Sequence, residues 1–200
     1  MKRPESLESG RIRIIGGDLR GRRLSVPHQR DLRPTPDRVR ETLFNWLAPL
    51  IRGSRCLDLF AGSGALGFEA ASRGADRVVM LDRVPATIRF LQANRRLFAL
   101  DHQIEIIQVD ALQWLRTARA EWFDVIFLDP PFDADLLGPC CQALQERRWL
   151  GSEAKVYLET PAKIGFPPLP AGWNLVRDRQ AGQVRFGLAE TGESSPDILP

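Results

Sequence analysis

A run of glycines follows a short apolar segment in the first third of the chain. Gly62, Gly64 and Gly67 fit the pattern G-x-G-x-x-G, and they stand between a strand-like and a helix-like segment. Glycines in this position let the chain turn sharply and let a ligand approach the backbone. Asp82 lies further along, where a carboxylate can accept hydrogen bonds from a ribose diol. The spacing indicates a nucleotide-like ligand, and a nicotinamide or flavin nucleotide is one candidate.

Two further aspartates narrow the choice of ligand. Asp58 precedes the glycines, where its charge disfavours a pyrophosphate and suits an ammonium or sulfonium group. Asp110 follows a third strand-like segment and can accept a hydrogen bond from the amine of adenine, although it can equally cap the following helix. S-adenosylmethionine has a cationic end, a ribose diol and an adenine, but no phosphate. The aspartates therefore fit this cofactor better than NAD. The alternative for the glycines is a turn that only lets the helix pack on the strand and binds no ligand.

A second motif, Asp129-Pro130-Pro131-Phe132, follows a very apolar segment. Prolines fix their φ angles and donate no backbone hydrogen bond, so nearby carbonyls can face a ligand. The Asp129 carboxylate and the Pro130 carbonyl can accept both hydrogens of an exocyclic amine, and the Phe132 ring can stack on the base. Such acceptors aim the lone pair of the amine at a methyl donor. The motif predicts methylation of an amino-bearing base, and the alternative is a strand exit stiffened by prolines.

The other reactive side chains form no further motif. His28 and His102 are isolated, and no His, Cys and Asp spacing resembles a metal site, so we expect no metal. Cys140 and Cys141 are expected to be small core residues in a helix. Together with Cys56 they make an odd number of cysteines, which fits a reducing cytoplasm.

Alternating strand-like and helix-like segments position these motifs. Short apolar runs separated by helices predict βαβ units, and hence a parallel sheet with helices on both faces. The carboxyl ends of parallel strands share one edge, where open α/β sheets bind ligands. We expect strands at 55–60, 77–81, 104–109, 123–128 and 155–160, and helices ending near 73 and covering 85–100, 111–119 and 136–149.

Two last strand-like segments lie at 173–179 and 183–189. Only Gln180-Ala181-Gly182 separates them, which leaves no room for a crossover helix, so they should form an antiparallel hairpin at the end of the sheet. The sequence therefore predicts an α/β, Rossmann-like fold with a mostly parallel seven-stranded sheet.

The N-terminal part of the chain is basic. Residues 1–55 hold 13 Lys and Arg against 6 Asp and Glu, whereas residues 56–200 hold 15 against 19. Arginine and isoleucine alternate at 11–15, and a returning segment at 22–27 predicts a hairpin. This hairpin suggests contact with a polyanion, and a merely solvated basic face is the alternative. The arginines in question are Arg11, Arg13, Arg20, Arg22 and Arg23.

We expect three parts along the chain. Residues 1–50 would form a small RNA-binding appendage, in which a helix at 36–50 follows the hairpin and has Thr35 as its N-cap. Residues 51–189 would form the catalytic domain, and 190–200 a flexible tail. No apolar run approaches the roughly 18 residues of a membrane-spanning helix, and the N-terminus lacks the apolar stretch of a signal peptide, so we expect no membrane contact and a cytoplasmic protein.

These motifs together resemble the class I S-adenosylmethionine-dependent methyltransferases that modify amino groups. The wider pattern is similar to the 16S rRNA (guanine(966)-N2)-methyltransferase family of the RsmD type, over residues 11–189. The N-terminal strings are the most specific part, because the other two motifs occur in many methyltransferases. The resemblance is carried by Arg13-Ile14-Ile15-Gly16-Gly17, Leu32-Arg33-Pro34-Thr35, the run from Asp37 to Leu47, the glycine loop, and Asp129 to Phe132.

The resemblance implies methyl transfer from S-adenosylmethionine to the N2 amine of one guanine in 16S rRNA. The substrate would be the small ribosomal subunit or an assembly intermediate, and we expect the enzyme to act as a monomer. The segment from Thr35 to Arg40 would close over the cofactor, and the hairpin arginines would grip RNA phosphate. By position, the cofactor would be held by Asp58, Gly62, Gly64, Asp82, Asp110 and the backbone of Ala111, and the guanine by Asp129, Pro130 and Phe132.

Two other functions stay open from the residues themselves. A methyltransferase acting on DNA amines is the first, since the Asp-Pro-Pro-Phe motif does not choose the base, although 200 residues leave little room for a target-recognition domain. A NAD-binding oxidoreductase or a non-catalytic Rossmann module is the second. In this second class the negative charge of Asp58 beside a pyrophosphate has no explanation, and the Asp129-Pro130-Pro131-Phe132 motif has no role.

Overall fold

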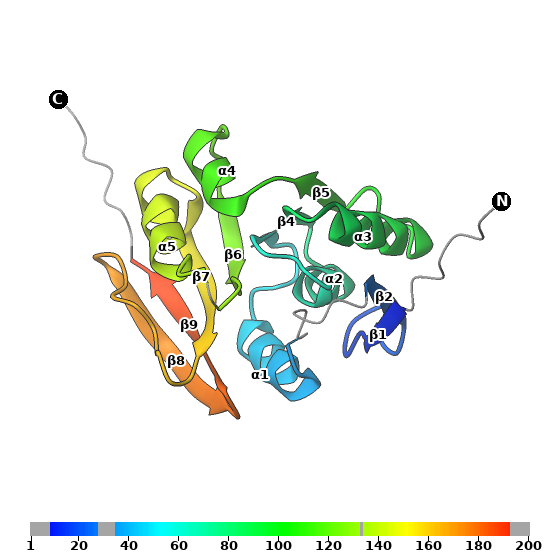
Figure 1. The fold of residues 1–200 in the computed structure, drawn as a ribbon, viewed down its shortest axis with the longest axis horizontal. Coiled ribbons are helices and arrows are strands. Elements are labelled where there is room, and N and C mark those ends of the chain that lie inside the picture. The colour runs from blue at the N-terminus through cyan, green and yellow to red at the C-terminus, as the bar shows by residue number, and fades with distance from the viewer. Residues whose placement is uncertain (1–8, 28–34, 133, 193–200) are drawn as a thin grey trace.

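The structure is a computed structural model of the 200-residue chain, and it describes residues 9–27, 35–132 and 134–192. The isolated His28 and three residues of one family string, Leu32, Arg33 and Pro34, lie outside this description. In the described ranges, seven strands form one sheet and two more form a separate hairpin (Figure 1).

The large sheet is mostly parallel, with the strand order β5-β4-β3-β6-β7-β9-β8. At its centre β3 (Arg55–Asp58) pairs with both β4 (Arg77–Asp82) and β6 (Phe123–Leu128). The two C-terminal strands run antiparallel, and β9 inserts between β7 and β8. The predicted Rossmann-like α/β fold with its antiparallel hairpin is confirmed. The remaining strands are β5 (Ile104–Gln108), β7 (Leu150–Pro161), β8 (Trp173–Ala181) and β9 (Val184–Thr191).

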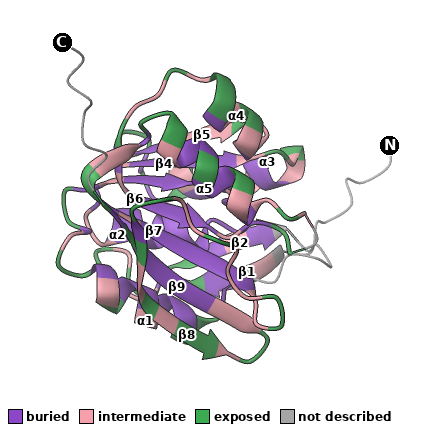
Figure 2. Ribbon diagram, turned by 90° about the vertical axis from the view of Figure 1, so that its left-hand side faces the viewer, coloured by how far each residue is buried: buried purple, intermediate pink, exposed green. Residues whose placement is uncertain are grey.

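Helices cover both faces of the sheet and bury two hydrophobic cores (Figures 1 and 2). Successive strand residues alternate between the cores, so that Val78 packs into the first and Val79 into the second. Burial on both faces explains the continuous apolar runs from which the strands were predicted. Cys140 and Cys141 are fully buried in the second core, as expected. The first face carries α1 (Asp37–Leu47), α2 (Ala65–Ser72) and α3 (Pro85–Leu97); the second carries α4 (Ala111–Thr117) and α5 (Leu137–Glu146).

The predicted N-terminal hairpin consists of β1 (Ser9–Arg13) and β2 (Arg23–Pro27), and it packs against the helices of the first face. Its connecting turn is held by Glu69 of α2, which accepts hydrogen bonds of 2.8 Å from the amides of Ile15 and Gly16. The fully buried Arg40 of α1 faces Glu69 at 3.5 Å and donates to the Arg13 carbonyl at 2.9 Å. The hairpin therefore has a fixed position beside α1 and α2.

Several element boundaries differ from the sequence expectation. The prediction that Thr35 caps α1 was wrong: Pro36 occupies the N-cap position, and no side chain bonds to the helix amides there. α5 ends at Glu146 because Arg148 adopts the left-handed region, with φ of 59°. β7 begins at Leu150 rather than 155. Among the described helices, none has the length and apolar character needed to cross a membrane.

Candidate functional site

The glycine loop forms the sharp connection between β3 and α2. Gly64 has a φ of 80°, and a Cβ there would lie 2.7 Å from carbons of Phe68 and Leu91. Gly67 lies inside α2 against Met80 of β4, where a Cβ would come within 2.8 Å of the Met80 side chain. Position 64 thus requires a residue that tolerates the left-handed region, and the glycine at position 67 permits close packing of α2 on the sheet. Both roles match the predicted pattern.

Asp58 is the last residue of β3 and lies beneath this loop. Asp58 is 2% exposed, and its Oδ2 accepts a hydrogen bond of 3.1 Å from the Gly67 amide. Burial raises the pKa of Asp58 to about 7, although the Gly67 amide lowers it in part, and the nearby Asp82 raises it further. Because water does not solvate this carboxylate well, a cationic ligand would stabilise its ionised form more than it would that of an exposed aspartate.

Asp82 ends β4 and fastens the glycine loop from the other side. Its Oδ2 accepts from the Gly62 amide at 3.0 Å, and its Oδ1 accepts from the Val84 amide at 2.7 Å. Burial raises the pKa of Asp82, while these amides act in the opposite direction. Each carboxylate oxygen has a second lone pair, so the side chain can still accept hydrogen bonds from a diol.

Asp110 lies beyond β5, which ends at Gln108, and it is the N-cap of α4. Its Oδ1 accepts a hydrogen bond of 3.0 Å from the Gln113 amide, so the helix-cap alternative is confirmed. A further role toward an adenine amine would use the remaining acceptor capacity of this carboxylate. The neighbouring Ala111 is buried in the second core.

The Asp129-Pro130-Pro131-Phe132 motif leaves the sheet at the end of β6. Pro130 is buried, whereas Phe132 beside it is 44% exposed, although most large apolar residues of the described chain are buried. The hydroxyl of Thr35 donates a hydrogen bond of 3.3 Å to Asp129 Oδ2. Thr35 therefore joins the segment before α1 to the exit of β6 instead of capping its own helix.

A buried carboxyl group that the sequence did not point to, that of Glu159, lies beside Asp129. Leu158 of β7 pairs with Leu128 of β6, so Glu159 follows in register with Asp129. Glu159 is 4% exposed, and the Tyr157 hydroxyl donates to its Oε2 at 2.7 Å. A signal existed in the sequence: this acidic residue directly follows the apolar run Val156-Tyr157-Leu158 near the carboxyl end of β7.

Four carboxyl groups at the ends of neighbouring strands share one face of the sheet. Residues two positions earlier in each strand, Cys56, Met80, Phe127 and Tyr157, all pack in the first core, so alternation directs the acids to the same side. Burial, followed by the charges of Glu159 and Asp58, raises the pKa of Asp129 well above its ordinary value. Burial also raises the pKa of Glu159. The four groups are Asp58 and Glu159, which are buried, and Asp82 and Asp129, which are half-buried.

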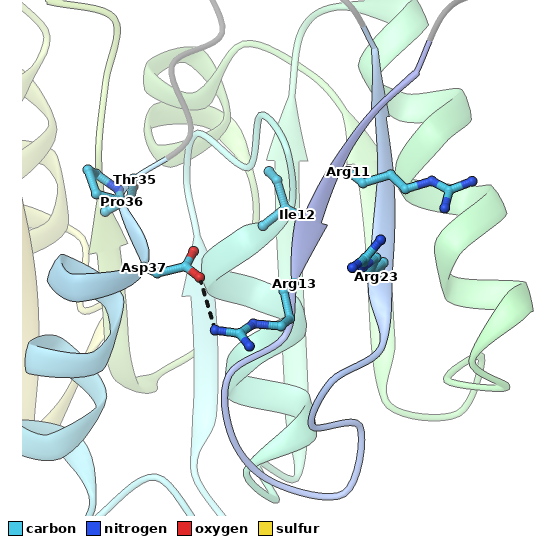
Figure 3. Close-up of a pocket in the computed structure, with 7 residues that line it drawn as sticks. All are labelled: Arg11, Ile12, Arg13, Arg23, Thr35, Pro36 and Asp37. Carbon is cyan, nitrogen blue, oxygen red and sulfur yellow. Dashed lines mark ion pairs between the residues drawn. The ribbon is translucent and has the colours of Figure 1, made fainter.

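A cavity of about 430 Å³ opens between the hairpin and the start of α1 (Figure 3). Arg11, Arg13 and Arg23 line it on the hairpin side, and Thr35 lines it on the side of the acidic cluster. Arg13 forms an ion pair of 3.6 Å with Asp37, whereas the guanidinium groups of Arg11 and Arg23 lie away from that carboxylate. The cavity therefore leads from a basic surface to the residue that contacts Asp129.

The other two hairpin arginines lie elsewhere. The Arg22 guanidinium stacks over the ring of Phe98, 5.2 Å from its centroid, at the end of α3. Arg20 is exposed in the turn between the strands. The structure thus brings together three of the five predicted arginines. In the described part of the chain, no group of three or more His, Cys, Asp and Glu residues could hold a metal ion.

Known proteins resemble the chain over nearly its whole length. A family described as conserved hypothetical protein 95 matches residues 12–190. The ribosomal RNA small subunit methyltransferase D of Escherichia coli K12 is 43% identical over 200 residues, covering 98% of this chain and 100% of the relative. Its namesake in Haemophilus influenzae is 43% identical, covering 90% and 93%. A solved Escherichia coli structure has a TM-score of 0.85 at 41% identity, covering 92% of this chain and 99% of that chain.

Proposed function

The chain belongs to the family of ribosomal RNA small subunit methyltransferase D, and we propose that it methylates the exocyclic N2 amine of one guanine in 16S rRNA, with S-adenosylmethionine as its cofactor. Membership makes it an rRNA methyltransferase, and the resemblance seen in the sequence is thereby confirmed. The choice of the guanine amine, and the roles of individual residues below, are our proposal.

The donor set around the glycine loop fits this cofactor. The buried Asp58 gains from a positive charge, and Asp82 retains lone pairs for a diol. A pyrophosphate would instead place negative charge beside these carboxylates, which argues against NAD. Gly62, Gly64, Asp110 and the Ala111 backbone complete the proposed cofactor site. When bound, S-adenosylmethionine supplies the methyl group, whose carbon bonds to the amine nitrogen as the carbon–sulfur bond breaks and leaves its electron pair on sulfur.

The main support for the proposal is that Asp58, which would bind the cofactor, lies next to Asp129, which would bind the target base. Asp58 pairs with Phe127 across β3 and β6, so Asp129 emerges next to the end of β3. The charge of Asp58 acts on Asp129 across this short separation. A target amine held by Asp129 would therefore lie beside the site that favours a sulfonium.

The chain's own groups suit an aromatic amine. Such an amine is a weak nucleophile because its lone pair is conjugated with the ring, and acceptors on its hydrogens direct that lone pair out of conjugation. The Asp129 carboxylate and the Pro130 carbonyl would accept these hydrogens, and the exposed Phe132 ring would stack on the base. Asp129 would also accept the proton that the amine loses on methylation.

The basic cavity suits the RNA backbone near the target base. Arginine binds phosphate bidentately and stacks on bases, and Arg11 and Arg23 present exposed guanidinium groups on the cavity wall. Thr35 lies at the inner end of this wall and contacts Asp129. We propose that the small ribosomal subunit, or an intermediate of its assembly, is the substrate, and that the enzyme acts on it as a monomer in the cytoplasm.

The direct test is transfer of labelled methyl groups from S-adenosylmethionine to small subunits that lack the modification, followed by mapping of the modified nucleotide. We expect one labelled guanine, with the methyl group on N2. Label on an adenine or cytosine amine, or on DNA in preference to rRNA, would contradict the proposal. Calorimetry should also show binding of S-adenosylhomocysteine and none of NAD.

A further inference from the structure

Helix α3 has an exposed side that the proposed reaction does not use. Arg89 and Arg96 are exposed there, and each is followed by an apolar residue, Phe90 and Leu97. The two pairs are about two helical turns apart, so they lie on the same side of α3. Leu97 is 60% exposed, and Phe90 is half-buried and belongs to neither hydrophobic core of the described chain. These residues are called the α3 surface below.

The α3 surface is basic, and its segment of the chain contains no acid. Residues 83–99 hold four arginines and no Asp or Glu. Arg95 pairs with Asp101 at 3.0 Å. In the part of the chain that the structure describes, the side chains of Arg89 and Arg96 have no such partner. The helix dipole stabilises Arg96 in the last turn, but Arg89 lies in the second turn, where the dipole gives an arginine no benefit.

The α3 surface continues the basic wall of the cavity across the hairpin. Arg11 of this wall lies opposite Ser25 in the register of the hairpin, and Asn94 of α3 binds the backbone of Ser25 (Figures 1 and 3). The Arg11 side chain extends across β2 (Figure 3). Helix residues are about 100° apart, so Phe90 and Leu97 lie within about 60° of Asn94 around the axis. Basic side chains therefore run from the cavity over the hairpin to α3.

The residue types of the α3 surface suit a nucleic acid. Guanidinium groups bind phosphate and stack on bases, and an exposed phenylalanine or leucine offers an apolar face to an unpaired base. An acidic protein can also pair with arginines, but the α3 surface continues the wall that is proposed to bind RNA, and one polyanion can cover both.

We propose that the α3 surface binds a second segment of the 16S rRNA, across the hairpin from the cavity. This inference rests on the proposed function and extends the proposed RNA contact beyond the cavity.

Two double variants test the charges of the α3 surface. R89A/R96A removes its two arginines, and the matched control R52A/R119A removes two exposed arginines elsewhere. Arg52 precedes β3, and Arg119 follows α4 on the other face of the sheet. We expect R89A/R96A to lower the slope of log affinity for small subunits against log salt by about 1.5 and to raise KM for small subunits about tenfold.

The control and the wild type should have the same salt slope and the same KM. The kcat at saturating subunits should be equal in all three proteins, because the α3 surface does not touch the reacting groups. Calorimetry with S-adenosylhomocysteine should give equal affinities as well, which verifies that both variants are folded.

A cross-linking experiment identifies what binds the α3 surface. Cys56, Cys140 and Cys141 are buried, so L97C would provide a single exposed thiol for a benzophenone label. Irradiation of the labelled protein with small subunits should join it to 16S rRNA. R119C, labelled in the same way, is the control position and should give no cross-link to rRNA.

Two kinds of result would overturn this inference alone. R89A/R96A with the wild-type salt slope and KM, or equal changes in R52A/R119A, would show that the α3 surface is not a specific RNA contact. Cross-links from L97C to a ribosomal protein and none to 16S rRNA would assign the surface to a protein partner. A wild-type enzyme that transfers no methyl group to small subunits would instead overturn the proposed function and this inference together.

Discussion

Asn94 of α3 binds both backbone groups of Ser25 in β2. Its Oδ1 accepts from the Ser25 amide at 3.0 Å, and its Nδ2 donates to the Ser25 carbonyl at 2.8 Å. Asn94 is 1% exposed, so the side chain extends the hairpin's hydrogen bonding into the interior of the protein. This contact fixes the basic hairpin relative to the helix that follows the cofactor site.

Replacement of this asparagine should loosen the hairpin. Asn94→Ala leaves both Ser25 groups without their partner, and we expect a loss of about 2 kcal/mol in the free energy of unfolding. Urea denaturation would measure the loss, and amide hydrogen exchange should rise first in β2. The exposed Arg96 on the same helix gives the control, Arg96→Ala. Equal exchange in β2 of wild type and Asn94→Ala would contradict the assigned role.

Asp129 should be needed for methyl transfer but not for cofactor binding. In Asp129→Ala the target amine loses its charged acceptor, so we expect kcat to fall by about a hundredfold or more. Affinity for S-adenosylhomocysteine should change by less than about threefold, because the proposed cofactor contacts lie on β3 and β4 and beyond β5. Radiolabel transfer and calorimetry would measure the two quantities. A comparable loss of both would remove Asp129 from the role of base acceptor.

The fold and the edge that carries the site were predictable from local patterns. Apolar runs and helix spacing predicted the sheet. Asp58 and Asp82 are the last residues of their strands, and they meet at one edge because the strands run parallel. The ends of these two strands could be predicted from the residues around them alone. The glycine loop was equally predictable, since its conformational demands are local.

The missed features depend on contacts between distant segments. The hydroxyl of Thr35 matches a local capping pattern, but it bonds to Asp129, 94 positions away. Glu159 becomes part of the site only because β7 pairs with β6, and strand order is not encoded in the spacing of either strand. Arg22 stacks on Phe98 instead of lining the cavity, because the hairpin docks on α3 through one face. The sequence placed all five hairpin arginines in one group, and tertiary packing divides them.

Cofactor affinity should depend on pH through Asp58. Burial raises the pKa of this carboxyl group to about 7, so it is mostly neutral at pH 6 and mostly ionised at pH 8. Only the ionised form attracts a sulfonium, and we expect S-adenosylmethionine to bind about tenfold more tightly at pH 8 than at pH 6. The thioether of S-adenosylhomocysteine should show a smaller change. Calorimetry on wild type and Asp58→Asn would test this, since the variant should bind with little pH dependence; an unchanged dependence would assign it to another group.

The basic wall of the cavity should determine how RNA affinity depends on salt. Arg11 and Arg23 are exposed there and lie away from Asp37, so both guanidinium groups are available to phosphate. Each phosphate contact releases counterions, and loss of two contacts should reduce the slope of log affinity against log salt by about 1.5.

The variant pair Arg11→Ala and Arg23→Ala, combined in one chain, tests this wall by titration of small subunits at several salt concentrations. Arg179→Ala on β8 is the matched control, because Arg179 is an exposed arginine at the opposite edge of the sheet from β5. S-adenosylhomocysteine binding should be unchanged in the double variant, since neither arginine belongs to the proposed cofactor site. If the double variant keeps the wild-type slope, or if Arg179→Ala lowers it as much, RNA phosphate is bound elsewhere on the protein.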